Sequence, residues 1–399
     1  MLKIFDPKKF LLFFILSAYF FLFVWSYSGN FEEQHFGYLS LSLLEGKFDL
    51  NNYPQVWDDT ALFSGKHYWP LGPFPAILLL PFTFIAKNLG YVVYERNLLW
   101  VLMLAVMYLI FKIARKFKYS EELSIIWALS FCMGSVFIST LIMPYSWYFS
   151  HTVTVLLIFI AFYEYLEQRR YFLIGIIYGA IYLTRASALL GIVFYLLSLF
   201  FTEDLSIWRR RKKLFQLLVP VGFSFLIMGS YNILRFNNFF DQGYSYQLLA
   251  EALIKARNYS LFSLIHLPGN LYYLLFASPV PVLRDGVSKV LKFPYITYDL
   301  WGLGMFYTSP YFLKLFILPY KDKLTKFLLT TSFLTAIPIL FYYGIGVKQY
   351  GYRYSLDFLP YLLMILIIAH KNSGVSRRFI FLIYFSILFN LYMILQIVF

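Results

Sequence analysis

The chain has 399 residues, of which 60% are hydrophobic, 23% are aromatic and only 14% are charged. A soluble domain of this length would need more charge to cover its surface, so the composition excludes a soluble fold and indicates a polytopic membrane protein. The formal net charge of +14 does not indicate nucleic-acid binding, because the basic residues cluster in short connections between apolar runs. The single cysteine, Cys132, excludes an intrachain disulfide framework.

In chain order, apolar runs of helical length predict membrane spans near 10–28, 97–114, 122–143, 151–167, 214–234, 300–319, 326–343, 356–370 and 378–398. Residues 171–201 are too long for one span and are flanked by basic residues, so they predict a hairpin of two helices with its turn at 184–187. Residues 71–87 contain three prolines and predict an interfacial or re-entrant segment. Together these elements predict an all-α polytopic membrane protein with about eleven spans.

More than half of the basic residues fall in six connections that this arrangement places on one side of the membrane. By the positive-inside rule that side is cytoplasmic, which predicts a multi-pass protein of the cytoplasmic membrane with its N-terminus inside. Two long connections, 29–96 and 235–299, then form external loops. No separate soluble domain is predicted, so residues 1–399 form a single integral membrane domain whose functional groups are expected in these loops.

The first external loop begins with NFEEQHFGYLSLSLLEGKFDL, in which acidic residues gather just outside a predicted span. Apolar residues recur at helical spacing from 36 to 44, which predicts a helix lying along the membrane interface. Its polar edge would carry Glu32, Glu33 and His35 into the water. Glu33 is either a capping residue within this helix or a catalytic carboxylate, and His35 is either a supporting site residue or an interfacial hydrogen-bonding residue.

Five stretches of the chain then carry a resemblance: HFGYLSLSLLEGKFDL with the later SGKHYWPLGPFPAILLLPF, YLTRASALL, YNILRFNNFFDQGYSYQ, GLGMFYTSPYFL and QYGYRYSLDFLPYLL. In this order they resemble the GT-C membrane glycosyltransferases. That family includes the protein O-mannosyltransferases, the aminoarabinose lipid A transferases and the bacterial relatives of glycosyltransferase family 39. The resemblance covers nearly the whole chain and implies a GT-C-like helical bundle with interfacial helices in the first external loop.

The resemblance implies an inverting transfer of a sugar from a polyprenyl-phosphate donor to a lipid, glycan or protein acceptor, on the outer face of the membrane. It also implies a carboxylate base at the start of the first external loop, which carries over to Glu33 or to its neighbour Glu32. The family usually has Asp at that position, so Glu is a departure. A second family carboxylate has no counterpart in the matching turn MPYSWYFSH, where His151 is the only titratable candidate.

Such a transfer needs cations near the leaving lipid phosphate, because that group gains negative charge. The candidate donor-phosphate residues are Arg185, Arg235, Lys348 and Arg353, with Tyr352 as a hydrogen-bonding neighbour. Arg185 could instead satisfy carbonyl groups at a helix end, and Arg235 could be a snorkelling residue. Arg353 could instead pair with Asp357, four residues later.

Asp58 and Asp59, later in the first loop, either solvate a turn or support catalysis. The sequence contains no metal-ligand spacing, although the resemblance leaves a divalent cation open because some members of the family need one. Expected partners are therefore the lipid-linked sugar donor, its acceptor and membrane lipids. Two alternatives stay open: a lipid-linked-sugar transporter or flippase without transfer activity, and an inactive member of the family that serves as a scaffold.

Overall fold

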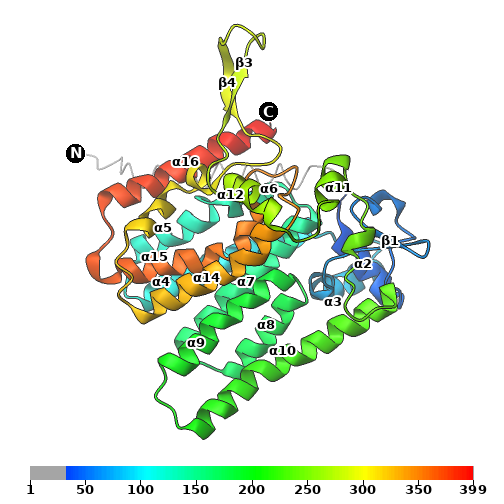
Figure 1. The fold of residues 1–399 in the computed structure, drawn as a ribbon, viewed down its shortest axis with the longest axis horizontal. Coiled ribbons are helices and arrows are strands. Elements are labelled where there is room, and N and C mark those ends of the chain that lie inside the picture. The colour runs from blue at the N-terminus through cyan, green and yellow to red at the C-terminus, as the bar shows by residue number, and fades with distance from the viewer. Residues whose placement is uncertain (1–32, 399) are drawn as a thin grey trace.

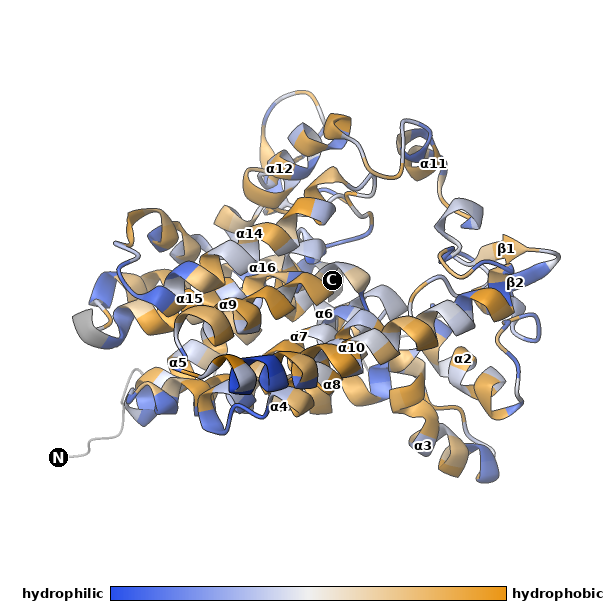
Figure 2. Cartoon of the chain, turned by 60° about the horizontal axis from the view of Figure 1, so that its bottom comes forward, coloured by the Kyte–Doolittle hydropathy of each residue, from blue (hydrophilic) through white to orange (hydrophobic). Residues whose placement is uncertain are grey.

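The computed structural model describes residues 33–398, so the predicted span 10–28 and Glu32 lie outside the described part of the chain. The fold is mostly helical (Figure 1). Within the described residues, five helices are long and apolar enough to cross a membrane: α4 (Arg96–Lys116), α7 (Ser146–Glu167), α10 (Ile207–Phe236), α14 (Lys323–Phe341) and α16 (Arg377–Val398). Hydrophobic residues occupy most of their positions (Figure 2). The chain is therefore a helical multi-pass membrane protein, but the predicted eleven spans are not confirmed.

The first loop folds into two short helices, a 3-10 turn and a small hairpin: α2 (His35–Leu44), η1 (Pro54–Val56), β1 (Ala61–Phe63), β2 (Lys66–Tyr68) and α3 (Phe74–Asn88). α2 packs against α3, where Ser40 Oγ donates a hydrogen bond to Thr83 Oγ1 at 2.9 Å. Because α2 begins at His35, Glu33 precedes the helix. The interpretation of Glu33 as a capping residue within this helix is therefore wrong.

The predicted span 122–143 is a bent pair of helical segments. α5 (Glu121–Cys132) is followed by η2 (Val136–Ile138) and α6 (Ser139–Ile142), and the two parts meet at 66°. Ser135 causes the break, because its backbone is extended and its hydroxyl accepts a hydrogen bond from the Phe137 amide, which starts a new helical turn.

The predicted span 300–319 is also not one helix. It contains α13 (Met305–Thr308) and η6 (Pro310–Ile317), separated at Ser309. Pro310 has no amide hydrogen and disfavours helical angles at the residue before it, and Ser309 accordingly has φ −148° and ψ 58°. Apolar length alone did not reveal this break.

The predicted hairpin at 171–201 is present as α8 (Tyr171–Tyr182), η3 (Ala186–Ile192) and α9 (Val193–Phe201), and α10 runs alongside α8 (Figure 1). The first loop meets the turn of this hairpin at Gly72. A Cβ atom at Gly72 would lie 2.0 Å from the Leu183 carbonyl oxygen, so only glycine permits this approach. The Phe74 amide then donates a hydrogen bond to the same carbonyl at 3.1 Å.

The second loop and the chain after α14 supply the remaining elements: η4 (Tyr244–Tyr246), α11 (Glu251–Arg257), η5 (Leu264–His266), α12 (Leu267–Leu275), β3 (Val280–Leu283), β4 (Leu291–Thr297), η7 (Arg353–Asp357) and α15 (Leu359–Ser373). The antiparallel β3–β4 hairpin projects away from the helices (Figure 1).

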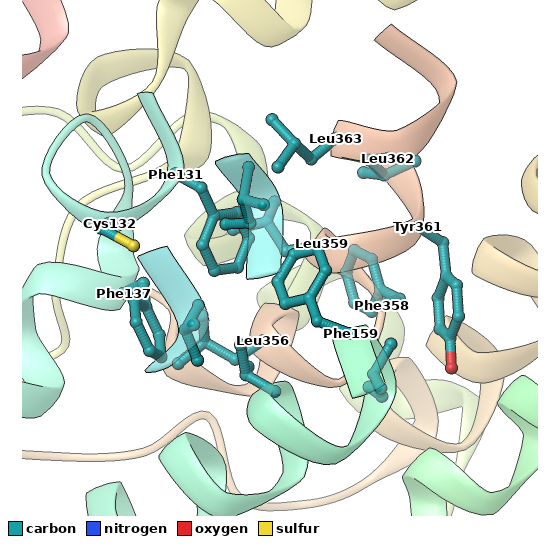
Figure 3. Packing of buried hydrophobic residues seen from close by; sticks show 14 of the residues in the cluster. Phe131, Cys132, Phe137, Phe159, Leu356, Phe358, Leu359, Tyr361, Leu362 and Leu363 are labelled. Carbon is teal, nitrogen blue, oxygen red and sulfur yellow. The ribbon is translucent and has the colours of Figure 1, made fainter. Parts of the chain in front are cut away.

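The core of the bundle lies where α5, η2, α7 and α15 meet (Figure 3). Its centre is filled by fully buried side chains, including Phe131, Phe137, Phe159, Leu359 and Leu363. This packing fixes the start of α15, and with it η7, against α7. The candidate site lies at that junction.

Candidate functional site

A cavity of about 410 Å³ lies where the first loop meets the start of α7 and the segment 342–354. We call it the polar cavity, because its lining includes three carboxylates and two cations: Glu33, Asp58, Asp59, Lys348 and Arg353. Aromatic rings complete much of the wall: Tyr145, Trp147, Tyr148, Tyr342, Tyr343 and Tyr354. Five of the residues predicted from the sequence are thus brought together here.

Glu33 is held by the first residue of α7. The Ser146 amide donates to the Glu33 carbonyl oxygen at 3.2 Å, and the Ser146 hydroxyl lies 3.0 Å from the same oxygen. The N-terminus of a helix carries partial positive charge, which favours nearby carboxylates. The backbone of Glu33 is therefore fixed, while its side chain remains partly exposed in the polar cavity.

Asp58 and Asp59 are positioned by contacts with α2 and with the start of α7. Trp147 Nε1 donates to Asp59 Oδ2 at 3.1 Å. His35 Nε2 lies 2.9 Å from the Asp58 carbonyl oxygen, and its ring stacks on Trp69 with centroids 3.9 Å apart. His35 is fully buried and does not line the polar cavity, so the expectation that its side chain projects into the water is wrong. It positions the Asp58 backbone instead.

Burial shifts the protonation of these groups. Burial, followed by the negative charge of Asp59, raises the pKa of Glu33, while Lys348, whose Nζ is 3.7 Å from Glu33 Oε1, opposes the shift. Burial also raises the pKa of Asp59, and the hydrogen bond from Trp147 opposes that change. Burial lowers the pKa of His35 to about 4, so this imidazole is neutral at neutral pH. A carboxylate with a raised pKa is a stronger base than an ordinary glutamate.

Glu95 was not identified as a site residue from the sequence, yet it holds the start of α2. Its Oε1 accepts from the Phe36 amide at 2.6 Å and lies 2.8 Å from Ser146 Oγ. Burial raises the pKa of Glu95 to about 7. A protonated Glu95 also fits its surroundings. The Ser146 hydroxyl has a single proton to donate, but it faces the Glu33 carbonyl and His35 Nδ1 as well as Glu95. A protonated Glu95 can supply a second proton to this group of acceptors.

Arg353 is a buried cation that lines the polar cavity. Its Nη1 donates to the Val347 carbonyl and to Gln349 Oε1, both at 3.3 Å, and its guanidinium lies 5.4 Å from the Tyr148 ring centroid. Its Nε has no hydrogen-bond partner among residues 33–398. The alternative ion pair between Arg353 and Asp357 is absent from residues 33–398, because Asp357 pairs with Arg185.

A second cavity, of about 470 Å³, adjoins the first and shares Trp147, Tyr342 and Tyr354 with it. We call it the apolar cavity, because its other lining residues are mainly hydrophobic: Leu71, Leu190, Phe240, Leu261, Phe262, Pro338 and Ile339. Arg185 and Ser187 are among its few polar residues. The ring of Tyr354 lies between the two cations, 5.7 Å from the Arg185 guanidinium and 5.1 Å from that of Arg353.

Arg185 is already paired. Its Nε and Nη2 donate to the two carboxylate oxygens of Asp357 at 2.7 and 3.1 Å, and Ser187 Oγ donates to Asp357 at 2.5 Å. His151 Nδ1 lies 3.3 Å from the same carboxylate. We call Arg185, Asp357, His151 and Ser187 the buried ionic cluster. His151 therefore contributes to this cluster and lines neither cavity.

Two further predicted residues lie apart from both cavities. Arg235 donates to the Trp69 carbonyl at 2.6 Å and to Asn232 Oδ1 at 2.9 Å, and it stacks on Tyr231 at 3.7 Å. Tyr352 is buried and donates to Asn270 Oδ1 at 2.8 Å. Both side chains connect elements of the fold, and neither lines the polar cavity with Arg353.

Comparisons of the chain with family models, with curated proteins and with solved structures found no match. Within residues 33–398, no group of three or more His, Cys, Asp or Glu side chains is arranged to hold a metal ion.

Sequence reasoning missed Ser146, Trp147 and Glu95. Their contacts join residues 51 to 113 positions apart, which no local pattern displays. One signal was present: Ser146 and Trp147 open an apolar helix of 22 residues, and a serine at such a position can bind backbone and carboxylate groups that approach the helix N-terminus.

Proposed function

We propose that this chain is a GT-C-type glycosyltransferase that moves a sugar from a polyprenyl phosphate to an acceptor hydroxyl of a lipid, glycan or protein. The observation that carries the proposal is the polar cavity, which is lined by Glu33, by Asp59 and by Arg353, a cation without a carboxylate partner among residues 33–398. An eleven-span bundle in the cytoplasmic membrane, with this cavity at the outer face, belongs to the same proposal.

In this mechanism Glu33 takes the proton of the acceptor hydroxyl while the hydroxyl oxygen bonds to the anomeric carbon of the sugar. The bond from that carbon to the phosphate oxygen breaks, and the polyprenyl phosphate leaves with the electron pair. Arg353, assisted by Lys348, stabilises the charge that develops on the phosphate. Attack on the face opposite to the leaving group inverts the anomeric configuration.

The surrounding side chains suit a sugar. The carboxylate of Asp59 can accept hydrogen bonds from sugar hydroxyls, and the rings of Trp147 and Tyr354 offer flat apolar surfaces to the C–H groups of a pyranose. The adjoining apolar cavity offers a hydrophobic environment for the first isoprene units of a carrier lipid. In this proposal Arg185 lies beside the carrier, and its charge is balanced by Asp357.

The proposal is tested with purified protein in lipid nanodiscs, a panel of polyprenyl-phosphate sugars and a panel of acceptors, with release of polyprenyl phosphate followed by mass spectrometry. We expect release with one donor class, and we expect Glu33→Gln to abolish it. Glu45→Gln is the matched control, because Glu45 lies in the same loop but is exposed and pairs with Lys47 and Lys87. Equal release by both variants would contradict the role of Glu33.

A lipid-linked-sugar transporter is the second candidate, and the buried ionic cluster favours it. Ionisable residues buried between membrane helices often mark the path of an ion or a substrate. However, His151 lies in the second turn of α7, near the end of a span and not at its middle. Movement of the intact lipid-linked sugar across a proteoliposome, without release of polyprenyl phosphate, would support transport over transfer.

A further inference from the structure

The β3–β4 hairpin projects away from the helical bundle (Figure 1). Its strands pair from Val280 with Thr297 to Leu283 with Leu291. Near its base, Gln396 Nε2 donates to the Ile296 carbonyl at 2.9 Å, and the Tyr392 hydroxyl donates to the Pro294 carbonyl. An isolated two-stranded hairpin is only marginally stable in water, so contact with another surface is expected to stabilise it.

One face of β4 is apolar and exposed. The side chains of Leu291, Phe293 and Tyr295 are 43%, 75% and 53% exposed. The rings of Phe293 and Tyr295 are 6.1 Å apart in an edge-to-face contact, which places both on the same side. The pairing of the strands is irregular between the Leu283–Leu291 and Pro281–Ile296 pairs, so the ring contact, and not regular alternation, groups the two aromatic side chains. Lys292 adjoins Leu291 and is also exposed. The hairpin therefore presents exposed apolar side chains beside a basic residue.

The tip of the hairpin is basic. Arg284 and Lys289 flank the turn, and Lys292 follows on β4, whereas Asp285 is the only acidic residue in this segment. The Asp285 carboxylate accepts hydrogen bonds from the Val287 and Ser288 amides at 2.9 and 2.8 Å, so it is part of the turn. Basic residues beside exposed aromatic rings complement a surface of anionic lipid head groups.

The attachment of the hairpin sets its depth. Tyr392 and Gln396 belong to the last turns of α16, whose apolar stretch Arg377–Gln396 is long enough to cross a membrane. The hairpin therefore leaves the bundle at the level where a span meets the head groups. The C-terminal half of α16 lies on the side of the candidate site. Its Asn390 accepts a hydrogen bond from the Tyr350 hydroxyl at 2.6 Å, and Tyr350 lies three residues before Arg353, which lines the polar cavity.

We propose that the β3–β4 hairpin rests on the lipid surface beside the bundle, with Leu291, Phe293 and Tyr295 among the head groups and Arg284 and Lys289 bound to anionic lipids. The hairpin thereby anchors the second loop at the membrane surface on the side of the two cavities. This proposal goes beyond the proposed function and does not depend on it.

The test uses single-cysteine fluorescence in nanodiscs of phosphatidylcholine with or without phosphatidylglycerol. Cys132 is buried and is the only cysteine in the sequence, so the unmodified chain serves as the reference for background labelling. The reporter is Leu291→Cys, which leaves both aromatic rings in place, and its matched control is the neighbouring Lys292→Cys. Each labelled variant is quenched either by spin-labelled lipids or by aqueous iodide.

We expect quenching by spin-labelled lipid at position 291 to exceed that at 292 by about threefold or more, because the proposal places position 291 among the head groups and the basic position 292 toward water. Iodide should give the reverse order. Adding phosphatidylglycerol should increase lipid quenching at 291, and Arg284→Gln with Lys289→Gln should remove that increase. Equal iodide quenching at both positions would overturn the proposal. So would protection of position 291 from both quenchers, which would indicate a protein partner or a second copy of the chain.

Discussion

The two adjoining cavities share three aromatic residues, Trp147, Tyr342 and Tyr354, but differ in how their charged residues are paired. Beside the apolar cavity, Arg185 is neutralised by Asp357 within the fold. In the polar cavity, Glu33, Asp58 and Asp59 approach one another while Arg353 has no carboxylate partner among the described residues. A buried charge that the fold itself neutralises contributes to structure, whereas charged groups of both signs that line one cavity suit a ligand with a donor hydroxyl and an anionic group.

The largest effect is expected from Glu33→Gln. If Glu33 is the base, sugar transfer should fall by about 100-fold to 10,000-fold. Thermal unfolding should change little, because the contacts that hold this residue use its backbone carbonyl. In the unmodified protein, activity should decline on acidification at a pH above the usual range of a glutamate, since the pKa of Glu33 is raised. A normal turnover rate in this variant would place the base elsewhere.

The next largest effect is expected on stability, from Asp357→Asn. This change leaves Arg185 buried without its partner, which should lower the free energy of unfolding by about 3–5 kcal/mol. Asp59→Asn is the control in the polar cavity. It removes a carboxylate that repels Glu33, so the free energy of unfolding should be unchanged or slightly higher. Thermal unfolding in detergent measures both. Similar losses of stability in the two variants would mean that the carboxylates beside the two cavities do not differ in their structural role.

A third, smaller effect concerns Glu95 and pH. Its pKa is about 7 in the folded protein and near 4.5 when unfolded, so the folded state holds the proton more tightly. The associated stability is complete below pH 4.5 and is lost as the pH rises through 7, with a total of up to about 3 kcal/mol. Glu95→Gln keeps an acceptor for the Phe36 amide and should remove this dependence. Unfolding curves of both proteins between pH 4.5 and 8 that stay parallel would argue against a protonated Glu95.

The smallest effect is expected from Lys348→Gln. The lysine side chain is 67% exposed and its Nζ is 3.7 Å from Glu33, so the stability change should stay below about 1 kcal/mol. Because Lys348 lowers the pKa of Glu33, its removal should move the acidic limb of the pH–activity profile to higher pH. Arg353→Gln, by contrast, should reduce transfer strongly. If the two variants behaved alike, the distinction between a buried and a surface cation would not hold.

Apolar length predicted the long helices α4, α7, α10, α14 and α16, because each must supply its own backbone hydrogen bonds across a hydrophobic stretch. The same signal failed at Ser135 and Pro310, where local hydrogen bonding and a missing amide break the helix. Hydropathy averages over such single positions.

The candidate site was predicted in part. Glu33, the two aspartates, Lys348 and Arg353 were chosen for their charge and their position in external segments, and they share one cavity. The partner of Arg185 could not be predicted, because Asp357 lies 172 positions away and four-residue spacing pointed to Arg353 instead. Only the packing of η7 against α7 and η3 brings these groups together.

The most direct test of the central claim is a cryo-EM structure of the Glu33→Gln protein in nanodiscs with a polyprenyl-phosphate sugar that the unmodified protein turns over. The account predicts the sugar in the polar cavity beside residue 33, with its phosphate in contact with Arg353 and its first isoprene units in the apolar cavity. Density for the phosphate bound elsewhere, with the polar cavity empty, would contradict it.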